Sequence, residues 1–565
     1  DQPRSRGLGD VYKRQILSLL ISFMGASCED WLYDNVNEDA AHEVLPQQVL
    51  PVVLFYSAQL QFDHAEYGAY LTQTLTTGGR NQTSSFAYKS GWGDFLTMNR
   101  HPQWRRHFYD IGVNAKEIID EAHEAQAWNL ELIGRTLRLM STQMTTDLFG
   151  DMPRSEAYES NSPHYDTQES IYEWMNQEIE ELIGMYEDPT YTEAATNIPI
   201  DQSIDRVFAG DLNKWKHYTY ALKARLLLRK LPNWENNAAT CQAIITAVNR
   251  ALEGWEDVLY RFDGGNGAQN SPWGEAFGST EQGGLGWEGR GNMLNSAVPT
   301  KYFMENILGV FESHNNLKGW AEDPRILAFM SARPGPSGTS DSSTEMRYLD
   351  TNIGMDVSYK VDNYPTLFPE VDGKKVSVYT QNTGYVPLFL EEELLLIKAE
   401  ATYWSGDKPT ARSLTMQAAE INFDRFNLSS IYGSSYTRYR NNYLGNETGT
   451  GNYVTTYFPA DGFNIGHIMR QKYVCLYLQP EQWTDMRRYN YSCEENGIQY
   501  DNTYVYPGLK RPNNIYEAHW GDDPKAWINR INYDPETEEK YNKAELERLG
   551  AYKNYQWLRK PMIWQ

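Results

Sequence analysis

Residues 129–153, NLELIGRTLRLMSTQMTTDLFGDMP, predict the long amphipathic helix around which the fold is built. Apolar side chains recur in this stretch at steps of three and four, which places them on one stripe of an α-helix. They are Leu130, Ile133, Leu137, Met140, Met144 and Leu148. Gly150 can supply a left-handed C-cap, and Pro153 cannot continue the helix. Because a helix with one apolar stripe must pack against partners, we expect similar helices elsewhere in the chain.

Other stretches repeat this pattern and predict a mainly α fold. Apolar stripes recur over residues 171–186, 215–226 and 390–404. Short turns join two pairs of helical segments, which are 108–124 with 129–149 and 389–404 with 408–425. We therefore predict a tetratricopeptide-like scaffold of helical hairpins with long irregular loops, although the chain shows no strict repeat signature.

A minor β element is expected between residues 330 and 388, where turn-rich sequence replaces the helical period. Asp372-Gly373 favours a hairpin turn within residues 371–376. No low-complexity linker divides the 565 residues, so we expect residues 28–565 to form a single domain.

Composition and motif content favour a binding protein over an enzyme. The net charge is −24 and the longest basic cluster is Trp104–His107, so no nucleic-acid partner is expected. The sequence contains no HExxH, GxxxxGK[ST] or GxSxG motif, and we predict no catalytic residues, metal or cofactor. Glu391–Glu393 is interpreted as the acidic first turn of a helix. A glycosidase needs only two carboxylates at the right separation, and it stays open as the minority alternative.

Residues 1–27 are predicted to be a non-native N-terminus followed by a signal peptide. Residues 1–15 are polar, do not begin with Met and show no periodicity, which is typical of a truncated or foreign segment. The apolar run Ile16–Ala26 follows Lys13 and Arg14. It is far shorter than the roughly twenty residues that span a bilayer, so it indicates the apolar core of a signal peptide.

The end of this run resembles the lipobox of bacterial lipoproteins. Small residues lead to Cys28, although Gly25 stands where the pattern prefers Leu. The resemblance implies that Cys28 carries a lipid and begins the mature chain; a signal peptide cut without lipidation is the alternative. Glu29-Asp30 resembles the acidic signal that directs such lipoproteins to the cell surface in Bacteroidetes-type bacteria.

Residues 74–100 lose the helical period and predict a ligand-binding loop. Arg80, Asn81, Tyr88 and Trp92 combine hydrogen-bonding groups with aromatic rings among several glycines. A sugar needs both kinds of group, because rings stack on its C–H face and polar side chains bind its hydroxyls. An ordinary surface loop is the alternative, but a loop of this length usually has a function of its own.

A second excursion, residues 262–299, is rich in glycine and predicts a similar platform. Trp273 and Trp287 lie there among polar residues, and we expect their rings to be exposed on a flexible backbone. Core packing is the alternative for any single ring, because each ring can bury a large apolar area. Gly284–Gly289 matches GxGxxG, but no strand precedes it and no helix pattern follows, so no dinucleotide site is predicted.

Seven short blocks follow one another in an order typical of one family. They are Trp104–Tyr109 with Asn114, Arg138–Pro153 ending in FGDMP, Tyr165–Tyr172, Lys214–Leu226, Asp323–Arg325, Glu393–Ala401 and Arg470–Arg488. From Cys28 onward the chain resembles the SusD/RagB family of nutrient-binding lipoproteins, and it is most similar to the SusD-like branch. We interpret Phe149, Gly150 and Pro153 as structural residues of this pattern.

The resemblance implies a lipoprotein of the cell outer membrane that faces the exterior. It would bind glycans and act as a lid on a SusC-type TonB-dependent transporter, with peptide binding in the same transport system as the alternative. The family's binding residues vary between members, so only their location carries over, to Arg80–Trp92 and Trp273–Trp287. The aromatic loops favour glycan over peptide.

Overall fold

The described part of the chain is mainly helical, as predicted. The computed structural model describes residues 45–76, 101–265, 269–277, 293–295, 297–310, 321–331, 364–445, 453–512 and 527–565. Its principal helices are α3 (Pro46–Leu71), α4 (Pro102–Arg105), α5 (Asn114–Glu124), α6 (Trp128–Phe149), α7 (Gln168–Glu187), α8 (Pro189–Thr192), α9 (Leu212–Leu228), α10 (Ala238–Leu252), α11 (Ile326–Phe329), α12 (Glu391–Trp404), α13 (Lys408–Phe426), α14 (Ser429–Leu444), α15 (Val454–Tyr457), α16 (Ile465–Cys475), α17 (Glu481–Arg488), α19 (Glu538–Tyr541), α20 (Lys543–Leu549) and α21 (Tyr555–Arg559).

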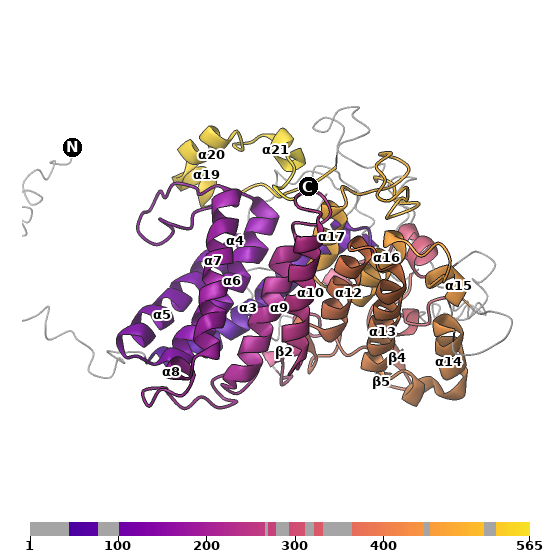
Figure 1. The fold of residues 1–565 in the computed structure, drawn as a ribbon, viewed down its shortest axis with the longest axis horizontal. Coiled ribbons are helices and arrows are strands. Elements are labelled where there is room, and N and C mark those ends of the chain that lie inside the picture. Colours follow the sequence, from indigo (N-terminus) through magenta and orange to yellow (C-terminus); the bar gives the residue numbers. More distant parts are fainter. Residues whose placement is uncertain are drawn as a thin grey trace, which may run out of the picture.

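Shorter or wider helical turns complete this set. They are the π-helices η3 (Arg106–Val113) and η8 (Tyr302–Ile307) and the 3-10 turn η7 (Met293–Asn295). The helices follow one another across the molecule from α5 to α14, while α19, α20 and α21 lie together along one edge (Figure 1). Within the described ranges, no helix combines the length and the apolar character that crossing a bilayer requires.

Helix α6 is the helix predicted from residues 129–153. It ends at Gly150, whose φ of +87° is a conformation that residues with a Cβ rarely adopt. Arg135 and Thr142 lie outside the predicted apolar stripe, yet both are buried because α3, α5 and α7 all pack against α6. The buried part of α6 is therefore wider than the predicted apolar stripe.

Both predicted helical hairpins are present. Helix α5, which continues from η3, packs against α6, and α12 packs against α13. Helices α7, α9 and α10 form further neighbouring pairs, in which α6 contacts α7, α7 contacts α9 and α9 contacts α10. The scaffold is therefore a succession of paired helices, as the sequence predicts.

In the described ranges the β structure consists of three two-stranded antiparallel sheets. Strand β1 (Leu75–Thr76) pairs with β3 (Val298–Pro299), and β2 (Val258–Arg261) pairs with β6 (Tyr385–Phe389). Strands β4 (Glu370–Val371) and β5 (Lys374–Lys375) form the predicted hairpin. Its turn residues Asp372 and Gly373 both have positive φ, which is the conformation that an Asp-Gly hairpin turn requires.

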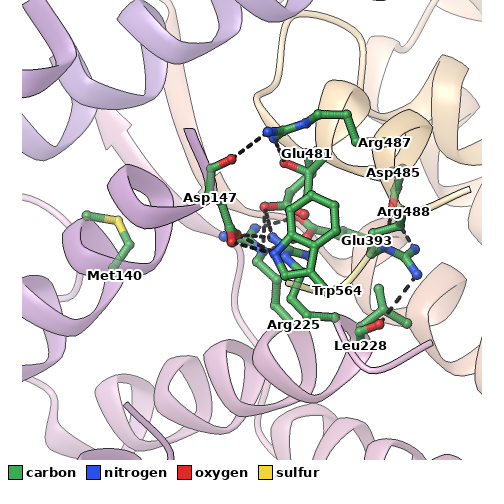
Figure 2. A network of polar contacts seen from close by, with 12 residues as sticks. Met140, Asp147, Arg225, Leu228, Glu393, Glu481, Asp485, Arg487, Arg488 and Trp564 are labelled. Carbon is green, nitrogen blue, oxygen red and sulfur yellow. Dashed lines mark hydrogen bonds and ion pairs between the residues drawn. The ribbon is translucent and has the colours of Figure 1, made fainter. Parts of the chain in front are cut away.

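A buried ionic network joins the blocks that carry the family resemblance (Figure 2). The guanidinium of Arg229, the C-cap residue of α9, lies 2.9 Å from Asp147 on α6 and 2.7 Å from Glu481 on α17. Arg225 donates to Glu393 on α12 at 2.8 Å, so Glu393 is an ion-pair partner as well as a first-turn residue. Removing one partner of such a buried pair typically costs about 3–5 kcal/mol, which explains why these blocks serve the fold.

Candidate functional site

The sheet of β1 and β3 brings together the bases of the two loops that the sequence predicts to bind ligand. Leu75 lies opposite Pro299 and Thr76 opposite Val298, so the start of the first loop meets the end of the second. Arg80, Asn81, Tyr88, Trp92 and Trp287 themselves lie outside the described residues, as does Cys28. Their assignment to a ligand site stays a prediction.

Hydrogen bonds fix this base to the helical core. The backbone N–H of Thr300 donates to the carbonyl of Thr74 at 3.3 Å. The Thr74 hydroxyl donates to the Tyr473 hydroxyl on α16 at 2.7 Å, and Tyr473 in turn donates to the carbonyl of Thr72 at 3.0 Å. The chain therefore leaves β3 on a rigid support and enters η8 directly.

A cleft of about 340 Å³, here called the amide cleft, opens beside η8. Residues 499–507 and helix α16 form its other walls. Its main polar and aromatic side chains are Tyr302, Asn306, Asn464, His467, Arg470, Gln499, Asn502, Tyr504 and Tyr506. None of the described residues that line it is Asp or Glu, although the chain carries a net charge of −24.

Arg470 is the cation of the amide cleft, and its position is fixed. Its Nε donates to the carbonyl of Ile307 at 3.0 Å, and its guanidinium lies 4.0 Å from the ring centroid of Tyr457. The backbone carbonyl and the aromatic face both stabilise the positive charge. Arg470 is therefore a positioned donor in a wall that otherwise consists of neutral groups.

His467 adds a second donor to the amide cleft. Its Nδ1 accepts a hydrogen bond from the backbone N–H of Asn464 at 3.1 Å, and its ring stacks on Phe463. Burial lowers the pKa of His467 to about 4, so the ring is neutral at pH 7. A neutral imidazole that accepts at Nδ1 carries its proton on Nε2, which leaves Nε2–H as a donor.

Tyr302 and Asn306 present polar groups from η8. The Tyr302 hydroxyl is buried and has no hydrogen-bond partner among the described residues, and burial raises its pKa well above 10. A buried hydroxyl without a partner costs free energy that a bound acceptor would recover. Asn306 lies against Gly508, where an added Cβ would lie 2.2 Å from the amide nitrogen.

Trp273 contradicts the prediction that its ring is an exposed platform. The ring is 1% exposed and lies 4.5 Å from the Phe62 ring in an edge-to-face contact. Its segment is held by a hydrogen bond from the Ser271 N–H to the carbonyl of Asn382 at 2.9 Å. Glycine content alone indicated a flexible backbone, but these contacts place Trp273 in the core. Its contact with a ligand stays a prediction.

The residues of the amide cleft are the ones that sequence reasoning missed. Gln499, Asn502, Tyr504 and Tyr506 lie in a short run of amides and tyrosines, which is the signal that was available. The run is short and far in sequence from both predicted loops. Only the fold shows that it faces η8.

A helical-hairpin scaffold that carries a polar and aromatic cleft defines a ligand-binding class of protein. The model of the SusD-like family, described as "Starch-binding associating with outer membrane", matches residues 47–506. The chain therefore belongs to the SusD-like family. No curated protein sequence matches it.

Solved structures of SusD homologues share the fold. A chitin-binding SusD homologue from Flavobacterium johnsoniae is 16% identical, with a TM-score of 0.59, and the match covers 91% of this chain and 99% of that one. A SusD homologue from Bacteroides uniformis is also 16% identical, with a TM-score of 0.59 and coverage of 92% and 99%. A SusD/RagB family protein from Bacteroides thetaiotaomicron is 16% identical, with a TM-score of 0.57 and the same coverage. At these identities the likeness concerns the fold.

Proposed function

We propose that this protein binds neutral glycans in the amide cleft, together with the two predicted loops, and returns them chemically intact. The observation that carries the proposal is the composition of the cleft, which combines amides, tyrosines and one fixed arginine without a described carboxylate. Sugar hydroxyls donate and accept hydrogen bonds, and amide side chains do both. A volume of about 340 Å³ is within the usual range for small-molecule sites.

Delivery to a SusC-type TonB-dependent transporter is the biological role that we propose. Membership of a family described as associating with the outer membrane supports this role. We further propose that Cys28 carries a lipid anchor, that residues 28–565 form a single domain, and that the protein faces the exterior.

The test uses calorimetry with soluble oligomers of chitin and starch, which the names of the relative and of the family suggest as probes. Gly508→Ala should weaken binding by roughly tenfold, since a Cβ 2.2 Å from the Asn306 amide must displace it and cost one or more hydrogen bonds. Gly497→Ala is the matched control, because Gly497 also has positive φ but nothing lies within 4 Å of its Cβ position.

Equal loss of affinity in the two variants would show that the effect comes from backbone strain, and it would contradict binding in the amide cleft. If no oligosaccharide binds but peptides do, the glycan assignment is wrong. Chromatography of each bound oligosaccharide after long incubation tests the other half of the proposal. Reproducible shortening would favour a glycosidase.

A further inference from the structure

A second cavity, here called the arginine pocket, is lined by residues of η3, α5, α6, α7 and the segment that joins α6 to α7. It has a volume of about 210 Å³, and its walls include Lys116, Arg138, Arg154, Ser155, Tyr158 and Trp174. Arg138 comes from α6, Trp174 from α7, and Arg154 from the segment that joins these two helices. The pocket is therefore built on the predicted central helix and lined by residues that the amide cleft does not use.

Two guanidinium groups share one aromatic ring in this pocket. The Cζ of Arg138 lies 5.8 Å from the Trp174 ring centroid, and the Cζ of Arg154 lies 5.2 Å from it. The electron-rich face of Trp attracts each cation, but two like charges at one ring also repel each other. An anion between them would remove this repulsion.

Arg154 has no carboxylate partner among the described residues, and Arg138 shares one with Arg135. Arg138 forms an ion pair with Glu178 at 3.6 Å, but the Glu178 carboxylate also accepts hydrogen bonds from Arg135 at 2.8 and 3.0 Å. The side chain of Arg154 forms no hydrogen bond or ion pair with any residue in the described ranges. The Nε atoms of Arg138 and Arg154 are both buried without an acceptor among these residues. Buried donors of charged groups are costly to leave unpaired.

The acidic residues that line the pocket do not pair with Arg138 or Arg154. Asp120 is paired with Lys116 at 2.5 Å, and Glu159 lies exposed at the rim. The Asp166 carboxylate instead accepts from the backbone N–H groups of Arg154 at 2.8 Å and Ser155 at 2.9 Å. Asp166 thus fixes the segment that carries Arg154, but it forms no hydrogen bond with the Arg154 guanidinium.

We propose that the arginine pocket binds the anionic substituent of an acidic glycan, either a sulfate ester or a uronate carboxylate. Guanidinium groups match both oxyanions, because their N–H donors pair with two oxygens at once. The volume of about 210 Å³ suits such a substituent better than a whole oligosaccharide. This inference rests on glycan binding as the proposed function, and it adds a second site of different charge.

A larger groove beside the arginine pocket provides room for the rest of the glycan. The groove has a volume of about 810 Å³ and shares Lys116, Pro153, Tyr158 and Glu159 with the pocket. Two of its rings are exposed to solvent, with Tyr109 at 56% and Tyr541 at 70% exposure. Exposed rings are suited to stack on sugar faces. A chain held by its anionic group in the pocket therefore lies across aromatic surfaces.

Calorimetry on the full chain tests this site with sulfated, uronate and neutral oligosaccharides of equal length, and with sodium sulfate as the anion alone. The wild type should bind at least one anionic oligosaccharide more tightly than the neutral one. Arg154→Gln and Arg138→Gln should each weaken that binding by roughly tenfold or more, since a charge-assisted hydrogen bond is lost. The sulfated and uronate arms identify which oxyanion the pocket takes.

Arg261→Gln is the matched control, since Arg261 also lies over an aromatic ring, 5.5 Å from the centroid of Tyr385, but lines neither cavity. Arg154 is the decisive variant if Arg138→Gln fails to fold, because its side chain holds no described partner. If Arg154→Gln binds the anionic oligosaccharides with wild-type affinity, the proposal is wrong. It is also wrong if the protein binds sodium sulfate but binds neither anionic oligosaccharide. Gly508→Ala should leave anionic binding unchanged, so failure of the amide cleft is distinguishable from failure of this pocket.

Discussion

The amide cleft and the arginine pocket both have aromatic walls, but they differ in how their cations are compensated. Arg470 in the amide cleft donates from Nε to a backbone carbonyl and lies over Tyr457, so its Nε–H is engaged within the protein. Arg138 and Arg154 in the arginine pocket leave buried Nε–H groups without a described acceptor. The aromatic rings therefore do not distinguish the two sites. The unpaired polar groups determine which ligand each can take.

The largest expected effect is a difference in stability between a variant of the core residue Trp273 and a variant of the pocket residue Trp174. Trp273 is fully buried, so Trp273→Ala should lower the free energy of unfolding by about 3–5 kcal/mol. Trp174 is half-buried between two arginines, so Trp174→Ala should cost less stability but weaken binding of an anionic glycan. Chemical denaturation and calorimetry on the two variants measure both quantities. A stable Trp273→Ala protein with impaired glycan binding would show that Trp273 contributes to ligand binding and not to the stability of the core.

A smaller effect concerns pH, because each cavity contains a histidine that burial keeps neutral. Burial lowers the pKa of His467 at the amide cleft to about 4 and that of His107 at the arginine pocket to about 3. Between pH 6.5 and these values the unfolded chain binds the protons that the folded chain does not. The free energy of unfolding should therefore fall as the pH falls, by about 1.4 kcal/mol per pH unit for each ring at most.

Urea denaturation between pH 7 and pH 5 measures this dependence, and His467→Gln should reduce its slope. Glu481 does not obscure the window. Burial alone would raise its pKa, but Arg229 and Arg225 lower it to about 2. Its contribution to stability is present above pH 4.5 and is lost only below that value. A slope that is unchanged in His467→Gln would mean that this ring is already protonated in the folded protein.

The helical scaffold was predictable because the apolar residues of each helix recur at a spacing that marks its buried face. Helix α6 begins and ends within a residue of the predicted bounds, and the Asp372-Gly373 turn is present as expected. Periodicity describes one element at a time, however, and the amide cleft combines η8, α16 and residues 499–507. Nothing local in sequence shows that Asn306 faces Gly508.

Trp273 and Arg154 also show that local sequence does not reveal long-range contacts. Glycine-rich sequence around Trp273 predicted exposure, but long-range contacts with Phe62 bury the ring. Arg154 directly follows the structural FGDMP block, and its guanidinium lies over Trp174 without a hydrogen bond or ion pair to any described residue. In both cases the decisive contact joins residues that are distant in the sequence.

We expect the two cavities to bind ligands of different charge independently. Titration of a neutral glycan into the wild-type protein, first alone and then with a saturating anionic oligosaccharide, tests this independence. The dissociation constant of the neutral glycan should be the same in both titrations. Competitive weakening in proportion to the anionic ligand concentration would show instead that the two ligands share one site.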